Sequence, residues 1–155
     1  MMDASELAAD YVIVGAGSAG CVLAARLSED PSVRVILLEA GGDDRPGKEK
    51  GQFLSNLWIH VPIGYSQTLK DPKVNWLYET EPDPGTGGRR HVWPRGKVLG
   101  GSSSINAMLY VRGQRADYDH WRQLGCHGWG WDDVLPYFRR AQHQARGECE
   151  THAVG

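Results

Sequence analysis

The apolar positions at the start of the chain follow the pattern of a strand, a helix and a second strand. Residues 11–14 (Tyr-Val-Ile-Val) form a short, β-branched, uninterrupted run, which is typical of a parallel-sheet strand buried on both faces. A helix is predicted over 19–27, where Leu23 and Leu27 share one face, and a second apolar run over 33–39 predicts the next strand. This order predicts a βαβ unit and therefore an α/β fold.

Three glycines, in the spacing GxGxxG, connect the first strand to the helix. Gly15 permits a tight turn, Gly17 lets a pyrophosphate approach the backbone, and Gly20 lets helix and strand pack closely. The helix N-terminus then offers amide N–H groups and the positive end of the helix dipole to the phosphates. The pattern predicts a dinucleotide-binding unit, and the alternative is a glycine turn without a ligand.

An acidic residue, Glu39, ends the second predicted strand, nineteen residues after Gly20. In such units a carboxylate at this position accepts hydrogen bonds from the ribose diol of the dinucleotide. A carboxylate also repels a 2′-phosphate, so the sequence disfavours NADP.

Residues 42–94 have a different texture, with frequent prolines and glycines between short apolar clusters. They predict a long irregular excursion that wraps over the nucleotide unit. A flexible linker is the alternative, but Trp58, Trp76 and Trp93 are expected to be buried, which argues against it.

Regular structure is expected again after residue 94. Two glycines and three serines over 100–104 predict a turn and a helix N-cap, with a helix beginning over 105–110. Two more helices are predicted over 117–124 and 132–141. Pro136 is expected in the first turn of the last helix, capped by Asp132 or Asp133.

Composition narrows the class of protein. The 155 residues fit one soluble globular domain, with 41% hydrophobic and 23% charged residues. The net charge of −2, without blocks of like charge, gives no indication of nucleic acid binding. No apolar run is long enough for a transmembrane segment, and the acidic start of the chain favours a cytoplasmic location. The three cysteines and six histidines form no metal-binding motif.

Two stretches together resemble the glucose–methanol–choline (GMC) oxidoreductases, particularly their choline dehydrogenase-like branch. They are residues 10–41 and the signature over 95–113, which contains Arg-Gly-Lys-Val-Leu-Gly-Gly-Ser-Ser-Ser-Ile-Asn and Tyr-Val-Arg-Gly. Residues 60–65, 75–78 and 128–138 are similar too. The resemblance implies a Rossmann-like FAD-binding fold with a partial parallel sheet. It divides the chain into a βαβ unit (10–41), an irregular excursion (42–94), a flavin-contacting signature (95–113) and a helical segment (114–146).

The resemblance also implies which residues bind FAD. The expected cofactor-binding residues are Gly15, Ala16, Gly17, Ser18, Ala19, Gly20, Glu39, Ala40, Val98, Gly101, Ser102, Asn106, Ala107, Met108 and Leu109. The last four are expected at the flavin ring, where backbone amides can stabilise developing negative charge. Some relatives attach the flavin through a histidine just before the asparagine. Because Ile105 occupies that position here, FAD is expected to be non-covalent.

The family's members are several times longer, and their catalytic histidine lies near the C-terminus. No residue here matches that motif, so no catalytic residue is assigned. The chain is expected to be an N-terminal piece that is inactive alone. The resemblance implies that, in the full-length enzyme, a histidine takes the proton of a small-molecule alcohol while hydride passes to the flavin.

The sequence is also compatible with two other functions. A non-catalytic nucleotide-binding module fits the absence of catalytic residues. An NAD-dependent dehydrogenase explains Glu39 but gives the signature over 95–113 no purpose.

Overall fold

The computed structural model describes residues 8–48 and 51–152. The chain divides into two compact units, Met1–Leu109 and Tyr110–Gly155. Within the described residues, no helix combines the length and the apolar character needed to cross a membrane.

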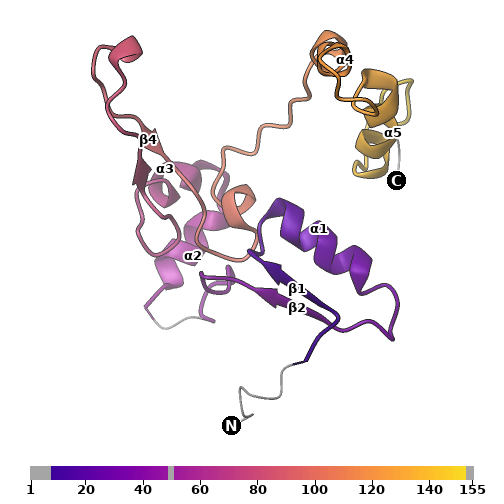
Figure 1. Cartoon of the computed structure of the whole chain (residues 1–155). Helices are drawn as coiled ribbons and strands as arrows, with labels where there is room; N and C mark the ends of the chain where they lie inside the picture. The colour runs from indigo at the N-terminus through magenta and orange to yellow at the C-terminus, as the bar shows by residue number, and fades with distance from the viewer. Residues whose placement is uncertain (1–7, 49–50, 153–155) are drawn as a thin grey trace. The chain divides into compact units, whose positions relative to one another are not determined.

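The first unit begins with the expected βαβ motif (Figure 1). Strands β1 (Tyr11–Val14) and β2 (Val35–Leu38) pair in parallel, with Tyr11 opposite Val35. Helix α1 (Ser18–Leu27) connects them and lies along the two strands. Its close approach to β1 depends on Gly20, because a Cβ there would lie 1.9 Å from the carbonyl oxygen of Gly15, the residue that follows β1.

The prediction that this strand is buried on both faces was wrong for the described residues. In β1 only Ile13 is buried, at 9% exposure, whereas Val12 is 59% and Val14 is 83% exposed. Alternate strand residues point to opposite faces, and α1 covers the face of Ile13. The other face of the two-stranded sheet is therefore an exposed apolar surface.

Residues 42–94 contain more regular structure than the sequence pattern indicated. They form the helices α2 (Phe53–Ile59) and α3 (Tyr65–Thr68), the 3₁₀ helices η2 (Pro62–Gly64) and η3 (Pro84–Thr86), and the antiparallel strands β3 (Tyr78–Glu79) and β4 (Val92–Trp93). The three tryptophans of this stretch are not buried. Trp58 is 36%, Trp76 42% and Trp93 51% exposed.

A small core lies beneath the signature stretch. Val74, Val98 and Ile105 are at most 2% exposed and pack together, with Ile59 and Leu69 against them. The core thus joins the excursion to the signature.

The helix predicted over 105–110 is absent. A short 3₁₀ helix, η4 (Gly101–Ser104), stands before it, and the chain is then extended. Serine and asparagine side chains compete for the backbone here. The Ser104 hydroxyl donates to the Leu99 carbonyl at 2.8 Å, and Asn106 Oδ1 accepts the Met108 N–H at 2.7 Å. Met108 consequently has a positive φ of 58°.

The second unit contains the two remaining predicted helices, α4 (Arg115–Gln123) and α5 (Trp131–Arg140). The N-cap of α5 is Gly130, and the Asp133 carboxylate accepts the Gly130 N–H at 3.0 Å. The helix therefore begins earlier than predicted, and Pro136 lies beyond its first turn. An aromatic cluster holds the two helices together, including an edge-to-face pair of Tyr118 and Phe138 at 5.8 Å.

Candidate dinucleotide site

The glycine turn after β1 is shaped by two different requirements. Gly15 has φ +95°, a conformation that side chains disfavour, and a Cβ on Gly20 would lie 1.9 Å from the Gly15 carbonyl oxygen. Gly17 caps α1 in an extended conformation (φ −77°), and a Cβ built on it meets no atom within 4 Å. Gly15 and Gly20 therefore serve the fold, whereas Gly17 borders open space.

The signature loop packs directly on this turn. A Cβ on Gly101 would lie 2.8 Å from Gly17 Cα, and the Gly100 N–H donates to the Ala16 carbonyl at 2.8 Å. The hydroxyls of Ser18 and Ser103 are hydrogen-bonded to each other. Two segments about 85 positions apart thus form one surface.

The same loop is also attached to the end of β2. The Leu99 N–H donates to the Gly42 carbonyl at 3.0 Å, and Gly42 and Val98 form a parallel bridge. The Ser102 hydroxyl accepts the Gly96 N–H at 3.1 Å, which closes the loop on itself. The loop is consequently held against both halves of the βαβ motif.

The Glu39 carboxylate links the glycine turn to the chain after β2. One of its oxygens accepts the Ala16 N–H at 2.7 Å, and the other accepts the Gly41 N–H at 2.9 Å. Each carboxylate oxygen has a second lone pair. The side chain is half-buried, so these lone pairs can serve a ribose diol.

We expect Glu39→Ala to weaken FAD binding by about 1.5–3 kcal/mol, because charge-assisted hydrogen bonds to the ribose and to the turn are lost. Glu39→Gln is the matched control, since it keeps one acceptor and should lose less. Titration of each variant with FAD measures the dissociation constant. An unchanged constant for Glu39→Ala would show that the carboxylate does not face the ligand.

The glycine turn, the end of β2 and the signature loop surround a cleft of about 760 Å³. Its lining residues are Val14, Gly15, Gly17, Leu38, Glu39, Ala40, Trp76, Tyr78, Arg95, Gly96, Gly101 and Ser102. The structure thus brings six of the sequence-predicted residues to one cavity. Sequence reasoning missed Trp76, Tyr78 and Arg95, because an aromatic or a cation in an irregular stretch carries no signal of its own.

The other predicted residues have different positions. Ala16 is fully buried, while Ser18 and Ala19 begin α1. Val98 is 1% exposed with its side chain in the core, so any contact with a cofactor would come from its backbone. Leu109 is 84% exposed.

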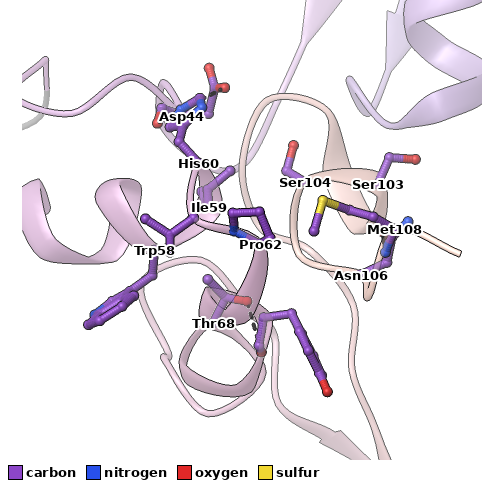
Figure 2. Close-up of a pocket in the computed structure, with 12 residues that line it drawn as sticks. Asp44, Trp58, Ile59, His60, Pro62, Thr68, Ser103, Ser104, Asn106 and Met108 are labelled. Atoms are coloured by element: carbon purple, nitrogen blue, oxygen red, sulfur yellow. Dashed lines mark hydrogen bonds and ion pairs between the residues drawn. The ribbon is translucent and has the colours of Figure 1, made fainter.

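A second, smaller cavity of about 240 Å³ adjoins the other end of the signature loop (Figure 2). Asn106 and Met108 line it, and Ala107 and Leu109 do not. Figure 2 shows His60 beside Asp44 across the cavity from these residues, and His60 Nε2 lies 3.4 Å from an Asp44 carboxylate oxygen.

In the loop after β2, the Asp43 carboxylate and the Arg45 guanidinium favour each other's charged form. A hydrogen bond from the Arg45 side chain holds the pKa of the Asp43 carboxyl well below its usual range. Among the described residues, no group of three or more His, Cys, Asp or Glu side chains could hold a metal ion.

A parallel βαβ motif, an open glycine turn and an acidic residue at the end of β2 together define a dinucleotide-binding protein of the α/β class. The chain belongs to the GMC oxidoreductase family, because the sequence model of that family matches residues 9–153. The resemblance and the fold class predicted from the sequence are therefore confirmed.

The chain is similar to several characterised enzymes. It is 52% identical over 138 residues to the mitochondrial choline dehydrogenase of Mus musculus, covering 88% of this chain and 22% of that protein. It is 50% identical over 137 residues to an alcohol dehydrogenase (acceptor) of Pseudomonas putida, covering 88% of this chain and 23% of that protein. The chain thus spans less than a quarter of the length of these two relatives.

Solved structures give the same result. The crystal structure of pyridoxine 4-oxidase from Mesorbium loti is 40% identical, with a TM-score of 0.80, and the match covers 96% of this chain and 27% of that one. An FAD-dependent oxidoreductase from Chaetomium thermophilum is 30% identical, with a TM-score of 0.71, covering 96% and 25%.

Proposed function

We propose that this chain is the FAD-binding portion of a flavin-dependent oxidoreductase that acts on the CH–OH group of a small-molecule alcohol. The observation that carries the proposal is the packing of the signature loop on the glycine turn, with Gly101 against Gly17. This contact places Glu39, Gly17 and Ser102 around one cleft. Relatives named choline dehydrogenase and alcohol dehydrogenase support the substrate class.

The residues present fit the cofactor. Gly17 leaves open space where a pyrophosphate can approach, and the first amides of α1 have no partner within the helix because of their position. The flavin, when bound, supplies the hydride acceptor. The chain's own residues bind and orient it, with Glu39 on the ribose and the Asn106–Leu109 backbone at the ring. No catalytic base is assigned to this chain.

An absorbance spectrum tests the proposal. Protein reconstituted with FAD and freed of excess cofactor should show the two visible bands of bound flavin, shifted from those of free FAD. Titration with NAD⁺ is the control, because a nicotinamide-dependent dehydrogenase would bind NAD⁺ and leave FAD free. Preference for NAD⁺ would contradict the proposal. FAD binding in a full-length version that turns over no alcohol would favour the binding module.

We expect the flavin to be released without covalent attachment. Ile105 has no nucleophilic atom and is only 2% exposed, packed against Val74 and Val98. Acid precipitation of the FAD-loaded protein should therefore leave all yellow colour in the supernatant. Flavin that stays on the denatured pellet would show a covalent link elsewhere.

The cytoplasmic location stays a sequence-based prediction.

A further inference from the structure

Two stacked aromatic side chains form a wall of the dinucleotide cleft. The rings of Trp76 and Tyr78 are nearly parallel, with an interplanar angle of 7° and centroids 5.9 Å apart. Both side chains line the cleft together with Gly17 and Glu39, and both remain partly exposed, at 42% and 52%. A planar heteroaromatic ring can extend such a stack, since it offers a face to an exposed aromatic side chain.

Two positively charged side chains lie near this wall. Lys97 Nζ lies 4.8 Å from the centroid of the Trp76 ring, and Arg95 itself lines the cleft. One guanidinium nitrogen of Arg95 donates to the Pro94 carbonyl at 2.7 Å, and its other donors are suited to phosphate oxygens. The wall therefore combines an aromatic surface with positive charge, which complements an aromatic ring joined to a pyrophosphate.

One buried amide fixes the backbone of the wall. Asn75 is 1% exposed, and its Oδ1 accepts the N–H groups of Leu77 and Arg95, both at 3.0 Å. Its Nδ2 donates to the Leu69 carbonyl at 2.8 Å. Leu77, between the two aromatics, has a positive φ of 54°, which a leucine adopts only where its surroundings impose it. The arrangement of the wall is thus set before any ligand binds.

We propose that Trp76 and Tyr78 bind the adenine ring of FAD and that Arg95 binds its pyrophosphate, on a backbone that Asn75 holds in place. This inference rests on the proposed function. The adenosine half is chosen over the flavin half because Glu39, expected at the ribose, lines this same cleft. The residues expected at the flavin ring, Asn106 and Met108, line the smaller cavity instead.

Calorimetric titration of the full chain with FAD, ADP and FMN tests the assignment. Replacing Trp76 and Tyr78 by leucine should weaken FAD and ADP binding by roughly tenfold to a hundredfold, and leave FMN, which lacks adenosine, unchanged. Tyr78→Leu alone is a milder variant with the same expected direction. Trp129→Leu is the matched control, because Trp129 is similarly exposed, does not line the cleft, and has its ring against that of Trp121. Arg95→Gln should make ADP affinity less dependent on salt.

The possible outcomes separate the two proposals. A wild-type chain that binds neither FAD nor ADP would contradict the proposed function and this inference with it. Wild-type FAD binding with unchanged ADP affinity in the leucine variants would overturn this inference alone. Loss of FMN affinity with ADP affinity intact would place the flavin ring at the wall and equally overturn the adenine assignment.

Discussion

Gly17→Val is expected to abolish FAD binding while the fold survives. The backbone at Gly17 is extended, which valine accepts, and no protein atom lies within 4 Å of the added Cβ. The valine side chain would extend from Gly17, which lines the cleft where the pyrophosphate is expected. Loss of two charge-assisted hydrogen bonds alone corresponds to about 3 kcal/mol or more, a decrease in affinity above about a hundredfold.

The measurement is FAD titration beside urea unfolding of the ligand-free protein. The free energy of unfolding should decrease by only about 1 kcal/mol, because valine is a poorer helix cap than glycine. Equal flavin occupancy in Gly17→Val and wild type would refute the pyrophosphate assignment. A large loss of stability without ligand would mean that Gly17 serves the fold instead.

Gly20→Val should have the opposite signature and unfold the first unit. Its Cβ would lie 1.9 Å from the Gly15 carbonyl oxygen, a backbone atom that cannot move without separating α1 from β1. Overpacking of this kind costs about 3 kcal/mol or more in the free energy of unfolding. Urea denaturation monitored by circular dichroism measures it.

Ala25→Val is the control for Gly20→Val, because Ala25 lies on the exposed side of the same helix. It should cost only about 0.5 kcal/mol through helix propensity. Comparable stability of Gly20→Val and Ala25→Val would show that helix and strand do not pack through Gly20. The pair Gly17 and Gly20 thus separates the binding role of the motif from its folding role.

The sequence predicted the βαβ motif well because its signals are local. Strand, glycine turn, helix and Glu39 follow one another within thirty positions, and each has a period or a backbone requirement that sequence displays. The burial of β1 was mispredicted, because burial depends on what covers the sheet and not on the strand itself.

The absence of a helix after η4 and the aromatic wall of the cleft could not be predicted from the sequence. Asn75 and Asn106 both use Oδ1 to hold a residue with positive φ two positions later, Leu77 and Met108. A single asparagine in sequence is equally compatible with a turn, a cap or a solvent-exposed side chain. The partners that distinguish these roles, such as Arg95 for Asn75, lie twenty positions away.

The attachment of the β3–β4 segment through Asn75 has a consequence for protein engineering. Asn75 and Arg95 fix the base of this segment, whereas its far end, around η3 and Gly87, is exposed and makes mainly local hydrogen bonds. Exposed loop tips of this kind accept inserted peptides most readily. A fluorescent or affinity tag could therefore be inserted between Gly87 and Gly88. The hydrogen bond between Asn75 and Arg95 at the base of the segment would stay intact.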